Sequence, residues 1–556
     1  MRILVLQLAR FGDIYLTWPS LRALQRQGHE VHLLVRERFQ AATLGLSGVT
    51  VHVLPTASIL EPILSTGSDS EALARLAAVT EELSALQFAK IINLSFSPAS
   101  SYLTQLLSQP STEVRGYTRH EDGYLSIPDD SSAYFYAQIG IDKPNRYHLN
   151  DVFAAVSDVT LLPQDRAPET HAKLDRLVVH LGASQIQKAY SPELWVQVLK
   201  NLAGRFLGEI ILIGSDDERV LSETVMKQAN MLELRNRTGE TSLPELFELI
   251  ASARVLIGAD SAPIHIAGLV GTPVLNLSSR TVNFWETGPS SPGSRVLFAE
   301  DLQLLEPAVV ASEALALLNH RGPLGPCYVR TENGYDGYLQ NPKDEFAWQL
   351  LQALYTGSAY PKAPDLACRL AFQRLFELAE LALIQLARWK VDDHESSTAS
   401  QILGSIDQLL QELPRLNRDV APVVQWFQTQ RLRLPPASGD ETLRATRKLF
   451  EELLWIAAVY HQPQTDPRAA IALCSQLTPA LREYEFSAVE AEFQRLIASL
   501  QDLARHSTNV GERPWSSVLK GMNEALRRRD YIELADQLEY ELKPQLEFVS
   551  NFSSRP

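Results

Sequence analysis

Residues 1–28 read MRILVLQLARFGDIYLTWPSLRALQRQG, and this stretch decides the fold class. Residues 2–8 are an apolar run of strand length, and Gly12 and Asp13 interrupt the pattern shortly after it. Three leucines at helical spacing then predict a helix over residues 14–27, which a glycine closes. A buried strand followed at once by an amphipathic helix is typical of a parallel sheet that helices cover on both faces.

The same alternation of short apolar strands and amphipathic helices continues along the first 300 residues. It weakens between residues 110 and 176, where prolines gather, and we expect a connection between two domains at 163–169. The predicted strands are 31–35, 51–54, 90–94, 177–181, 209–213, 254–257 and 274–277. The predicted helices are 71–86, 192–206, 217–229, 242–253 and 263–270. The pattern therefore predicts two α/β halves in tandem, each of about 150 residues.

The character of the sequence changes after residue 325. Strand-length runs give way to long amphipathic segments, and no fixed-period repeat is present. The predicted helices are 366–390, 400–413, 440–460, 467–503 and 515–547. We therefore predict three domains, at 1–165, 166–325 and 326–556, the last of them all-helical.

Composition narrows the classes of function. The chain has 556 residues, of which 45% are hydrophobic and 21% charged, as is typical of a globular protein. Its formal net charge of -15 disfavours nucleic acid as the main partner. The three cysteines are far apart and form no CxxC motif, which fits a reducing compartment. Because no apolar run of about 18 residues occurs, we expect a cytoplasmic protein, with peripheral contact at the inner face of the membrane left open.

The first candidate site is the loop with Gly12 and Asp13, which follows the first strand. Open α/β sheets bind ligands at the carboxyl ends of their strands, so this loop faces the expected cleft. Gly12 permits either a close backbone approach or an unusual dihedral angle. Asp13 is either a functional carboxylate or the N-terminal cap of the following helix.

The second candidate site is the segment HLGAS that starts at His180, with Ser184 and Lys188 in the loop that follows the strand. Backbone amides and a lysine in such a loop are able to hold a phosphate. The alternative is a capped loop with a solvated lysine.

The third candidate site is Asp260, Ser261, Ala262, Pro263 and His265, which follow another predicted strand. Asp260 or Ser261 caps a short helix, and Pro263 lies in its first turn. The amides and the dipole of a helix N-terminus suit a pyrophosphate. A capped helix without a ligand, carrying a structural histidine, is the other interpretation.

Taken together, these loops resemble the heptosyltransferase-like glycosyltransferases of family 9, which have the GT-B fold. The resemblance covers about residues 1–300. It is carried by Gly12-Asp13 with Thr17 and Pro19, by Gly182-Ala183-Ser184 with Lys188, by Ile213-Gly214-Ser215 with Glu218, by the turn at 238–243, and by residues 260–265 followed by Gly271-Thr272-Pro273. It implies two facing Rossmann-like domains, and a final helix of the catalytic part that crosses back to the first domain between residues 312 and 355.

The resemblance also implies roles for the site residues. Asp13 is then the catalytic base of an inverting sugar transfer, and Lys188 neutralises the departing nucleotide diphosphate. The amides around Ser261 bind its phosphates, Glu218 contacts the ribose or base, and His265 supports the phosphate loop or the donor sugar. A lysine and a helix N-terminus stabilise the negative charge that develops on the leaving group, without a metal or other cofactor. The implied donor is ADP-heptose or a similar nucleotide sugar.

The sequence departs from the family pattern at Ala262, where a glycine is usual, and at residues 278–281, which replace Gly-Pro-Thr.

Three alternative functions remain open from the sequence. The protein transfers the sugar to a lipid-linked saccharide, or it transfers the sugar to a protein that the helical part holds. In the third alternative it is a non-catalytic nucleotide-sugar sensor or scaffold with a helical partner-binding domain.

Overall fold

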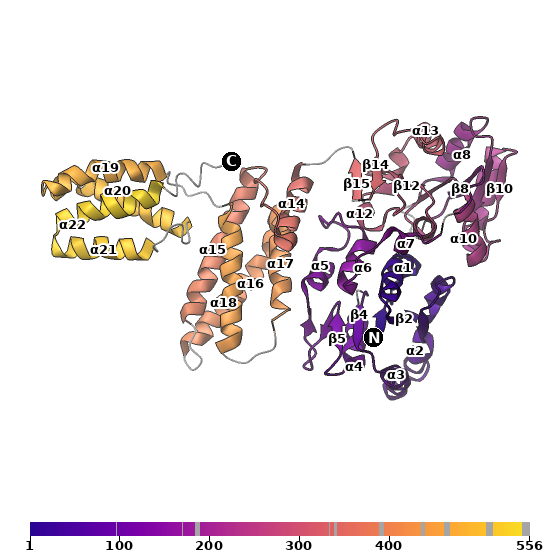
Figure 1. Cartoon of the computed structure of the whole chain (residues 1–556), viewed down its shortest axis with the longest axis horizontal. Helices are drawn as coiled ribbons and strands as arrows, with labels where there is room; N and C mark the ends of the chain where they lie inside the picture. Colours follow the sequence, from indigo (N-terminus) through magenta and orange to yellow (C-terminus); the bar gives the residue numbers. More distant parts are fainter. Residues whose placement is uncertain are drawn as a thin grey trace. The chain divides into compact units, whose positions relative to one another are not determined.

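The computed structural model describes residues 1–95, 97–169, 171–183, 189–332, 334–337, 342–388, 394–434, 440–460, 467–506 and 515–547. The chain divides into two compact units (Figure 1). We call the first the α/β unit, and it comprises Met1–Ser358 and Gln425–Pro436. The second, the helical unit, comprises Ala359–Val424 and Ala437–Pro556.

The first sheet of the α/β unit has five parallel strands in the order β3-β2-β1-β4-β5. In the central strand, Val5 pairs with Leu33 on one side and Ile92 on the other. The strand is buried after its first residue because helices cover both faces of the sheet. The strands are β1 (Arg2–Leu6), β2 (Glu30–Arg36), β3 (Thr50–Leu54), β4 (Lys90–Asn93) and β5 (Glu113–Arg115).

The helix predicted at 14–27 is confirmed as α1 (Phe11–Arg26), and Gly28 follows it with a φ of 82°. A glycine adopts this left-handed conformation without steric cost, which explains why the helix ends here. The other elements of this domain are η1 (Glu37–Thr43), α2 (Thr56–Thr66), α3 (Asp69–Ser84), α4 (Pro98–Leu107), the hairpin β6 (Thr118–Arg119) and β7 (Leu125–Ser126), α5 (Asp130–Gln138) and α6 (Leu149–Ser157).

The second sheet has the order β10-β9-β8-β11-β12-β13-β14-β15, and its strands are parallel up to β13. The parallel strands are β8 (Arg176–His180), β9 (Glu209–Ile213), β10 (Leu234–Asn236), β11 (Val255–Ala259), β12 (Val274–Ser279) and β13 (Arg295–Ala299). Their helices are α8 (Pro192–Leu202), η3 (Asp216–Glu218), α9 (Arg219–Ala229), α10 (Leu243–Ser252), α11 (Ala262–Leu269), α12 (Phe284–Thr287), η4 (Leu302–Leu304) and α13 (Pro307–Leu318). A short helix, α7 (Pro163–Arg166), lies in the predicted connection between the two domains.

The prediction that strands end before residue 325 was wrong. Two antiparallel strands, β14 (Tyr328–Thr331) and β15 (Gly334–Gly337), extend the second sheet at its edge. They are short and lack a continuous apolar run, and the aromatic cluster of Phe284, Trp285 and Tyr335 supports them through packing instead. Tertiary packing of this kind is not visible in a local pattern.

The expected return helix is α14 (Pro342–Thr356), which packs against the first domain. Tyr355 meets the ring of Tyr134 with centroids 5.0 Å apart, and Trp348 meets Tyr147 at 5.0 Å. The segment 425–436 also belongs to this unit, and Arg433 forms an ion pair with Asp130. The predicted fold class, α/β with two Rossmann-like domains of the GT-B type followed by an all-helical part, is confirmed.

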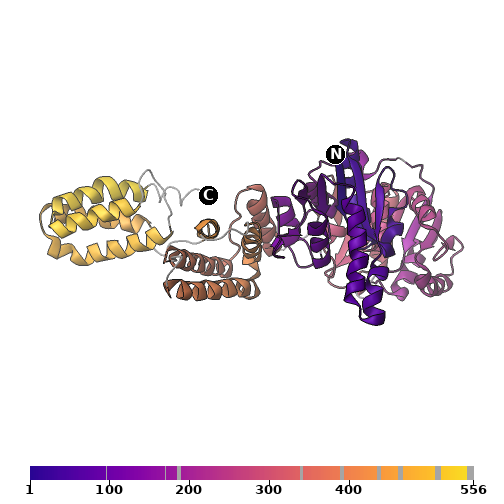
Figure 2. The same ribbon diagram turned by 90° about the horizontal axis from the view of Figure 1, so that it is seen from below.

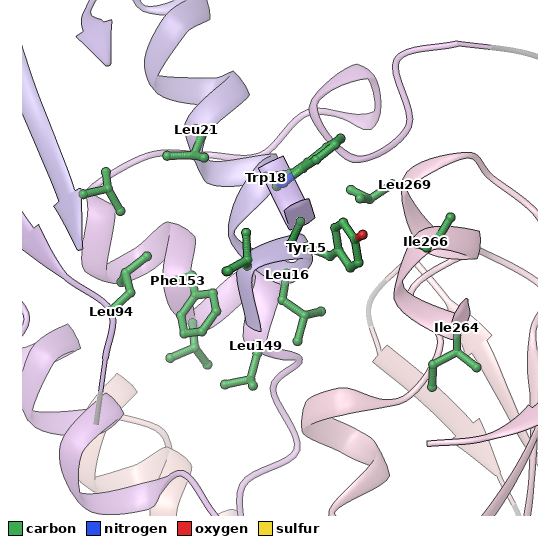
Figure 3. Packing of buried hydrophobic residues seen from close by; sticks show 14 of the residues in the cluster. Tyr15, Leu16, Trp18, Leu21, Leu94, Leu149, Phe153, Ile264, Ile266 and Leu269 are labelled. Carbon is green, nitrogen blue, oxygen red and sulfur yellow. The ribbon is translucent and has the colours of Figure 1, made fainter. Parts of the chain in front are cut away.

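The two α/β domains pack on each other through α1 (Figure 3). The indole of Trp18 stacks on Phe247 of α10, with ring centroids 5.7 Å apart and an interplanar angle of 20°. Tyr15 lies against the same phenylalanine at 5.7 Å. These two side chains share a buried cluster with Ile266 and Leu269 of α11, so α1 is held against the second domain by apolar contact.

The helical unit contains α15 (Leu366–Arg388), α16 (His394–Leu416), η5 (Arg418–Val420), α18 (Asp440–Ala458), α19 (Pro467–Arg482), α20 (Phe486–His506), α21 (Trp515–Arg528), α22 (Tyr531–Asp536) and the π-helix η6 (Gln537–Leu542). Helix α17 (Ala421–Arg431) spans the boundary between the units. Helix α15 packs against α16 and α18, and α19 packs against α20 and α22 (Figure 2). In the described part of the chain, no helix is long and apolar enough to span a membrane.

Two long helices of the prediction, 467–503 and 515–547, are each divided in the structure. Tyr484 and Arg529 have φ angles of 60° and 56°, which end α19 and α21 in the left-handed region. The side chain of Asp530 then accepts a hydrogen bond from the Glu533 N–H and starts α22. Neither residue is a glycine, so the sequence carried no turn signal at these positions.

Candidate functional site

The candidate loops follow the strands at which each sheet reverses its order of connection. β1 lies between β2 and β4, and β8 lies between β9 and β11. A crevice forms at the carboxyl ends of such strands because the chain leaves them toward opposite sides, and ligands bind there in open α/β sheets. Gly12 and Asp13 follow β1, residues 181–183 follow β8, and Asp260 follows β11.

Asp13 is the third residue of α1, and its carboxylate caps its own helix. Its Oδ2 accepts a hydrogen bond of 3.0 Å from the Arg10 N–H, and its carbonyl accepts one of 2.8 Å from the Thr17 hydroxyl. The side chain is half-buried. Burial raises the pKa of Asp13, and the Arg10 N–H and the charge of a protonated His265 oppose this rise. The N-cap residue of α1 is Arg10 and not Asp13, so the cap interpretation is wrong in that form. Asp13 instead accepts a hydrogen bond from the N–H of the N-cap residue, and this leaves its functional role open.

His265 reaches the loop of Gly12 and Asp13 from the second domain. It lies in α11, is only 8% exposed, and its ring occupies the space above Gly12. A Cβ on Gly12 would lie 2.8 Å from Cδ2 and 2.9 Å from Nε2 of the imidazole. The glycine is therefore needed for a close approach, and its φ does not lie in the left-handed region. The fold brings together two predicted site residues that lie far apart in the sequence.

Replacing Gly12 by alanine tests this contact. The added methyl group has to displace the His265 ring from its place above Gly12. We expect turnover to fall by about 10-fold to 100-fold, the cost of a displacement of about 1 Å in an active site. Gly322→Ala is the matched control, because a Cβ at Gly322 meets no atom within 4 Å. The steady-state rates of the Gly12→Ala and Gly322→Ala variants are compared. Equal rates of the two variants would mean that the position of His265 is unimportant for turnover.

The phosphate side of the candidate site is the N-terminus of α11. Ser261 is the N-cap residue with extended backbone, followed by Ala262 and by Pro263. The Ile264 N–H donates to the Ser261 carbonyl at 3.1 Å, so this amide, which we expected to bind phosphate, is already engaged. The first amides of a helix have no partner within the helix and point outward. Asp260 is fixed by a hydrogen bond of 3.0 Å from the Thr287 hydroxyl to its Oδ1.

Glu218 lies between the ends of β8 and β9, where two glycines leave room for its carboxylate. A Cβ on Gly182 would come within 1.4 Å of Oε1, and one on Gly214 within 2.6 Å of Oε2. Its Oε2 accepts hydrogen bonds from the Ser215 N–H at 2.7 Å and the Ser215 hydroxyl at 3.1 Å. Burial alone would raise the pKa of Glu218, but these donors and the imidazole of His180 outweigh it and lower the pKa.

His180 is the residue that the sequence interpretation missed. It ends β8, and its ring contacts both Ser261, at 3.0 Å, and Glu218, at 3.4 Å. The motif that begins with His180 was recognised, but the histidine was not assigned a role. Its position at the last place of a buried strand, directly before a glycine loop, was the only signal available.

Ser184 and Lys188 lie outside the described residues. No group of three or more His, Cys, Asp or Glu side chains suited to a metal ion occurs among residues that the structure describes.

Comparison with known proteins confirms the resemblance predicted from the motifs. Residues 133–303 match the model of glycosyltransferase family 9 (heptosyltransferase). The lipopolysaccharide heptosyltransferase 3 of Escherichia coli K12 is 32% identical over 111 residues, which are 20% of this chain and 32% of that protein. A second Escherichia coli protein of the same name is 31% identical over 111 residues, which are 20% of this chain and 33% of that protein. The chain thus spans about a third of the length of the curated relatives that it matches.

Two solved structures are similar as well. A family 9 glycosyl transferase from Veillonella parvula is 19% identical, with a TM-score of 0.45, over 57% of this chain and 97% of that one. The Escherichia coli heptosyltransferase WaaC with ADP is 16% identical, with a TM-score of 0.44, over 57% of this chain and 100% of that one.

Proposed function

We propose that this protein is an inverting glycosyltransferase of the family 9 type, which moves a sugar from a nucleotide diphosphate donor to a hydroxyl group without a metal. The observation that supports this most is the approach of His265 to Gly12, the neighbour of Asp13, across the two domains. A carboxylate from one domain then faces a helix N-terminus and a histidine from the other. This is the arrangement that a base and a leaving-group site require in a transfer between two substrates.

In the proposed reaction, the Asp13 carboxylate takes the proton of the acceptor hydroxyl. The oxygen attacks the anomeric carbon from the side opposite the diphosphate, and the bond between that carbon and the phosphate oxygen breaks. Its electron pair leaves with the nucleotide diphosphate, so the configuration is inverted. The amides of Ser261 and Ala262 at the start of α11, together with Lys188, stabilise the negative charge of the leaving group, and Glu218 holds the ribose or base.

For the substrates, we propose ADP-heptose or a related nucleotide sugar as the donor and a saccharide as the acceptor. The support is the match to proteins named lipopolysaccharide heptosyltransferases. With a lipid-linked saccharide, the reaction takes place on the cytoplasmic side of a membrane, through peripheral contact. Transfer to a protein hydroxyl and nucleotide-sugar binding without transfer are the alternatives that the following experiment distinguishes.

The proposal is tested by titrating ADP and ADP-heptose into the protein and measuring release of ADP with saccharide acceptors and, separately, with protein acceptors. Release with protein acceptors alone would favour transfer to a protein hydroxyl. Lys188→Ala is expected to weaken ADP binding by about 10-fold to 100-fold, because a hydrogen bond to a charged group contributes about 1.5–3 kcal/mol. Turnover is expected to fall as well, since the charged partner is present in both the ground state and the transition state.

The matched control is Lys200→Ala, which removes an exposed lysine from the last turn of α8. Equal ADP affinity of the Lys188 variant and the wild type would contradict the role of Lys188. Binding of ADP-heptose without release of ADP, whatever acceptor is added, would favour the sensor over the enzyme.

A further inference from the structure

His180 lies between the two halves of the candidate donor site. Its Nδ1 is 3.0 Å from the Ser261 hydroxyl oxygen, at the N-terminus of α11. Its Nε2 is 3.4 Å from Oε2 of Glu218. The ring is held in this position because β8 runs between β9 and β11, so that one side chain at its end reaches the loops that follow both neighbours.

The imidazole has a polar partner on each of its two nitrogen-bearing sides. The Ser261 hydroxyl has a single hydrogen, which it donates to the Ala259 carbonyl at 3.0 Å, so its oxygen accepts from His180 Nδ1–H. The carboxylate of Glu218 lies on the other side of the ring, 3.4 Å from Nε2. The imidazole is therefore placed between a carboxylate and a hydroxyl, with one ring nitrogen toward each.

The surroundings are shaped for this ring. His180 is 5% exposed, and Gly258 of β11 lies beside it, where an added Cβ would be 3.3 Å from the His180 Cβ. On the other side, Gly182 and Gly214 leave the space that the carboxylate of Glu218 occupies. Glycines at three strand ends therefore make room for the pair, and a side chain at any of them would press on one of the two partners.

We propose that His180 is a positioning residue that couples the nucleoside half of the donor site, at Glu218, to the phosphate half, at Ser261. The inference rests on the proposed function, in which Glu218 contacts the ribose or base and α11 receives the diphosphate. One imidazole ring then sets the distance between the two contacts, so that the nucleotide meets both at once. His180 itself does not touch the reacting atoms.

The test uses substitutions that each keep one of the two contacts. His180→Asn places an amide N–H near the position of Nδ1 and keeps the bond to Ser261, and His180→Gln places one near the position of Nε2 and keeps the bond to Glu218. Affinities of the full chain for ADP, adenosine and inorganic pyrophosphate are measured by calorimetry. We expect His180→Asn to weaken adenosine binding about 10-fold with pyrophosphate little changed, and His180→Gln to do the reverse. His180→Ala is expected to weaken all three ligands.

Two results would overturn the coupling role: wild-type affinity of His180→Ala for ADP, or equal losses of adenosine and pyrophosphate binding in both the Asn and the Gln variant. Circular dichroism verifies that each variant is folded, and the polar variants retain the test if the alanine variant unfolds. Should the wild-type protein bind none of the three ligands, the proposed function fails together with this inference. Binding by the wild type with no effect of His180 removes the inference alone.

Discussion

Asp13→Asn is expected to lower turnover by roughly 10²–10⁴-fold, the usual contribution of a positioned acid or base. Asparagine has the size of aspartate, and its Oδ1 is still able to accept the hydrogen bond from the Arg10 N–H. It has no basicity, so it cannot take the proton of the acceptor hydroxyl. Donor affinity is expected to stay near the wild-type value, because Asp13 acts on the acceptor. Calorimetry with ADP and chemistry-limited rates measure the two effects separately.

The pH dependence of the rate sharpens the test. Since burial raises the pKa of Asp13, the base form is lost on acidification at a pH above the ordinary aspartate value of about 3.9. The wild-type rate is therefore expected to fall on the acid side at a higher pH than an exposed aspartate would give. This acid limb should be absent from the residual rate of Asp13→Asn.

The same pKa shift predicts the effect on folding. A carboxyl whose pKa is raised in the folded protein binds its proton more tightly there than in the unfolded chain, so the ionised form costs stability at neutral pH. Asp13→Asn is therefore expected to be as stable as the wild type or slightly more stable at pH 7, and this difference should shrink at low pH. The control is Asp530→Asn, which alters a helix cap in the helical unit. If Asp13→Asn retained more than about a third of the wild-type turnover, Asp13 would be a cap alone.

The fold of the first 300 residues could be predicted because its signals are local. A fully buried parallel strand is an apolar run, and the helix behind it ends at a glycine such as Gly28. The site loops could also be predicted, since they follow the strands and carry glycine, serine and aspartate. The edge strands β14 and β15 lack such a run, and they are stabilised by rings from α12.

The contacts between the loops could not be predicted from the sequence. Gly12 permits either a close approach or an unusual dihedral angle, and only the position of His265 decides between them. The role of His180 likewise depends on the strand order, which places β8 between β9 and β11. Each depends on residues far apart in the chain, and no periodicity of a single segment reports on them.

Glu313→Gln is expected to be the most destabilising of the substitutions considered, with a loss of about 3–5 kcal/mol. Glu313 lies in α13 and is 1% exposed, and its Oε2 accepts a hydrogen bond of 2.7 Å from Arg295 of β13. Its Oε1 accepts from the N–H groups of Leu324 and Gly325, at 2.6 and 2.9 Å. The carboxylate thus joins the sheet, its covering helix and the segment that leads into β14. Glutamine retains an oxygen for the backbone donors but leaves the buried Arg295 without an opposite charge.

A second substitution separates the unpaired charge from the lost hydrogen bonds. In the double variant Arg295→Met with Glu313→Gln, the buried cation is gone, and we expect part of the stability to return, because an apolar side chain of similar volume costs less than an uncompensated ion. The control Glu300→Gln breaks the exposed pair of Arg280 and Glu300 and is expected to cost less than about 1 kcal/mol. Hydrogen exchange of peptides from α13 measures the stability of the two single variants and the double variant. It reports the opening free energy of the α/β unit separately from that of the helical unit. A loss of under about 1 kcal/mol in Glu313→Gln would mean that Arg295 finds another partner or water. A double variant less stable than the single one would mean that the remaining hydrogen bond of Arg295 to the Arg321 carbonyl and its packing outweigh the cost of its unpaired charge.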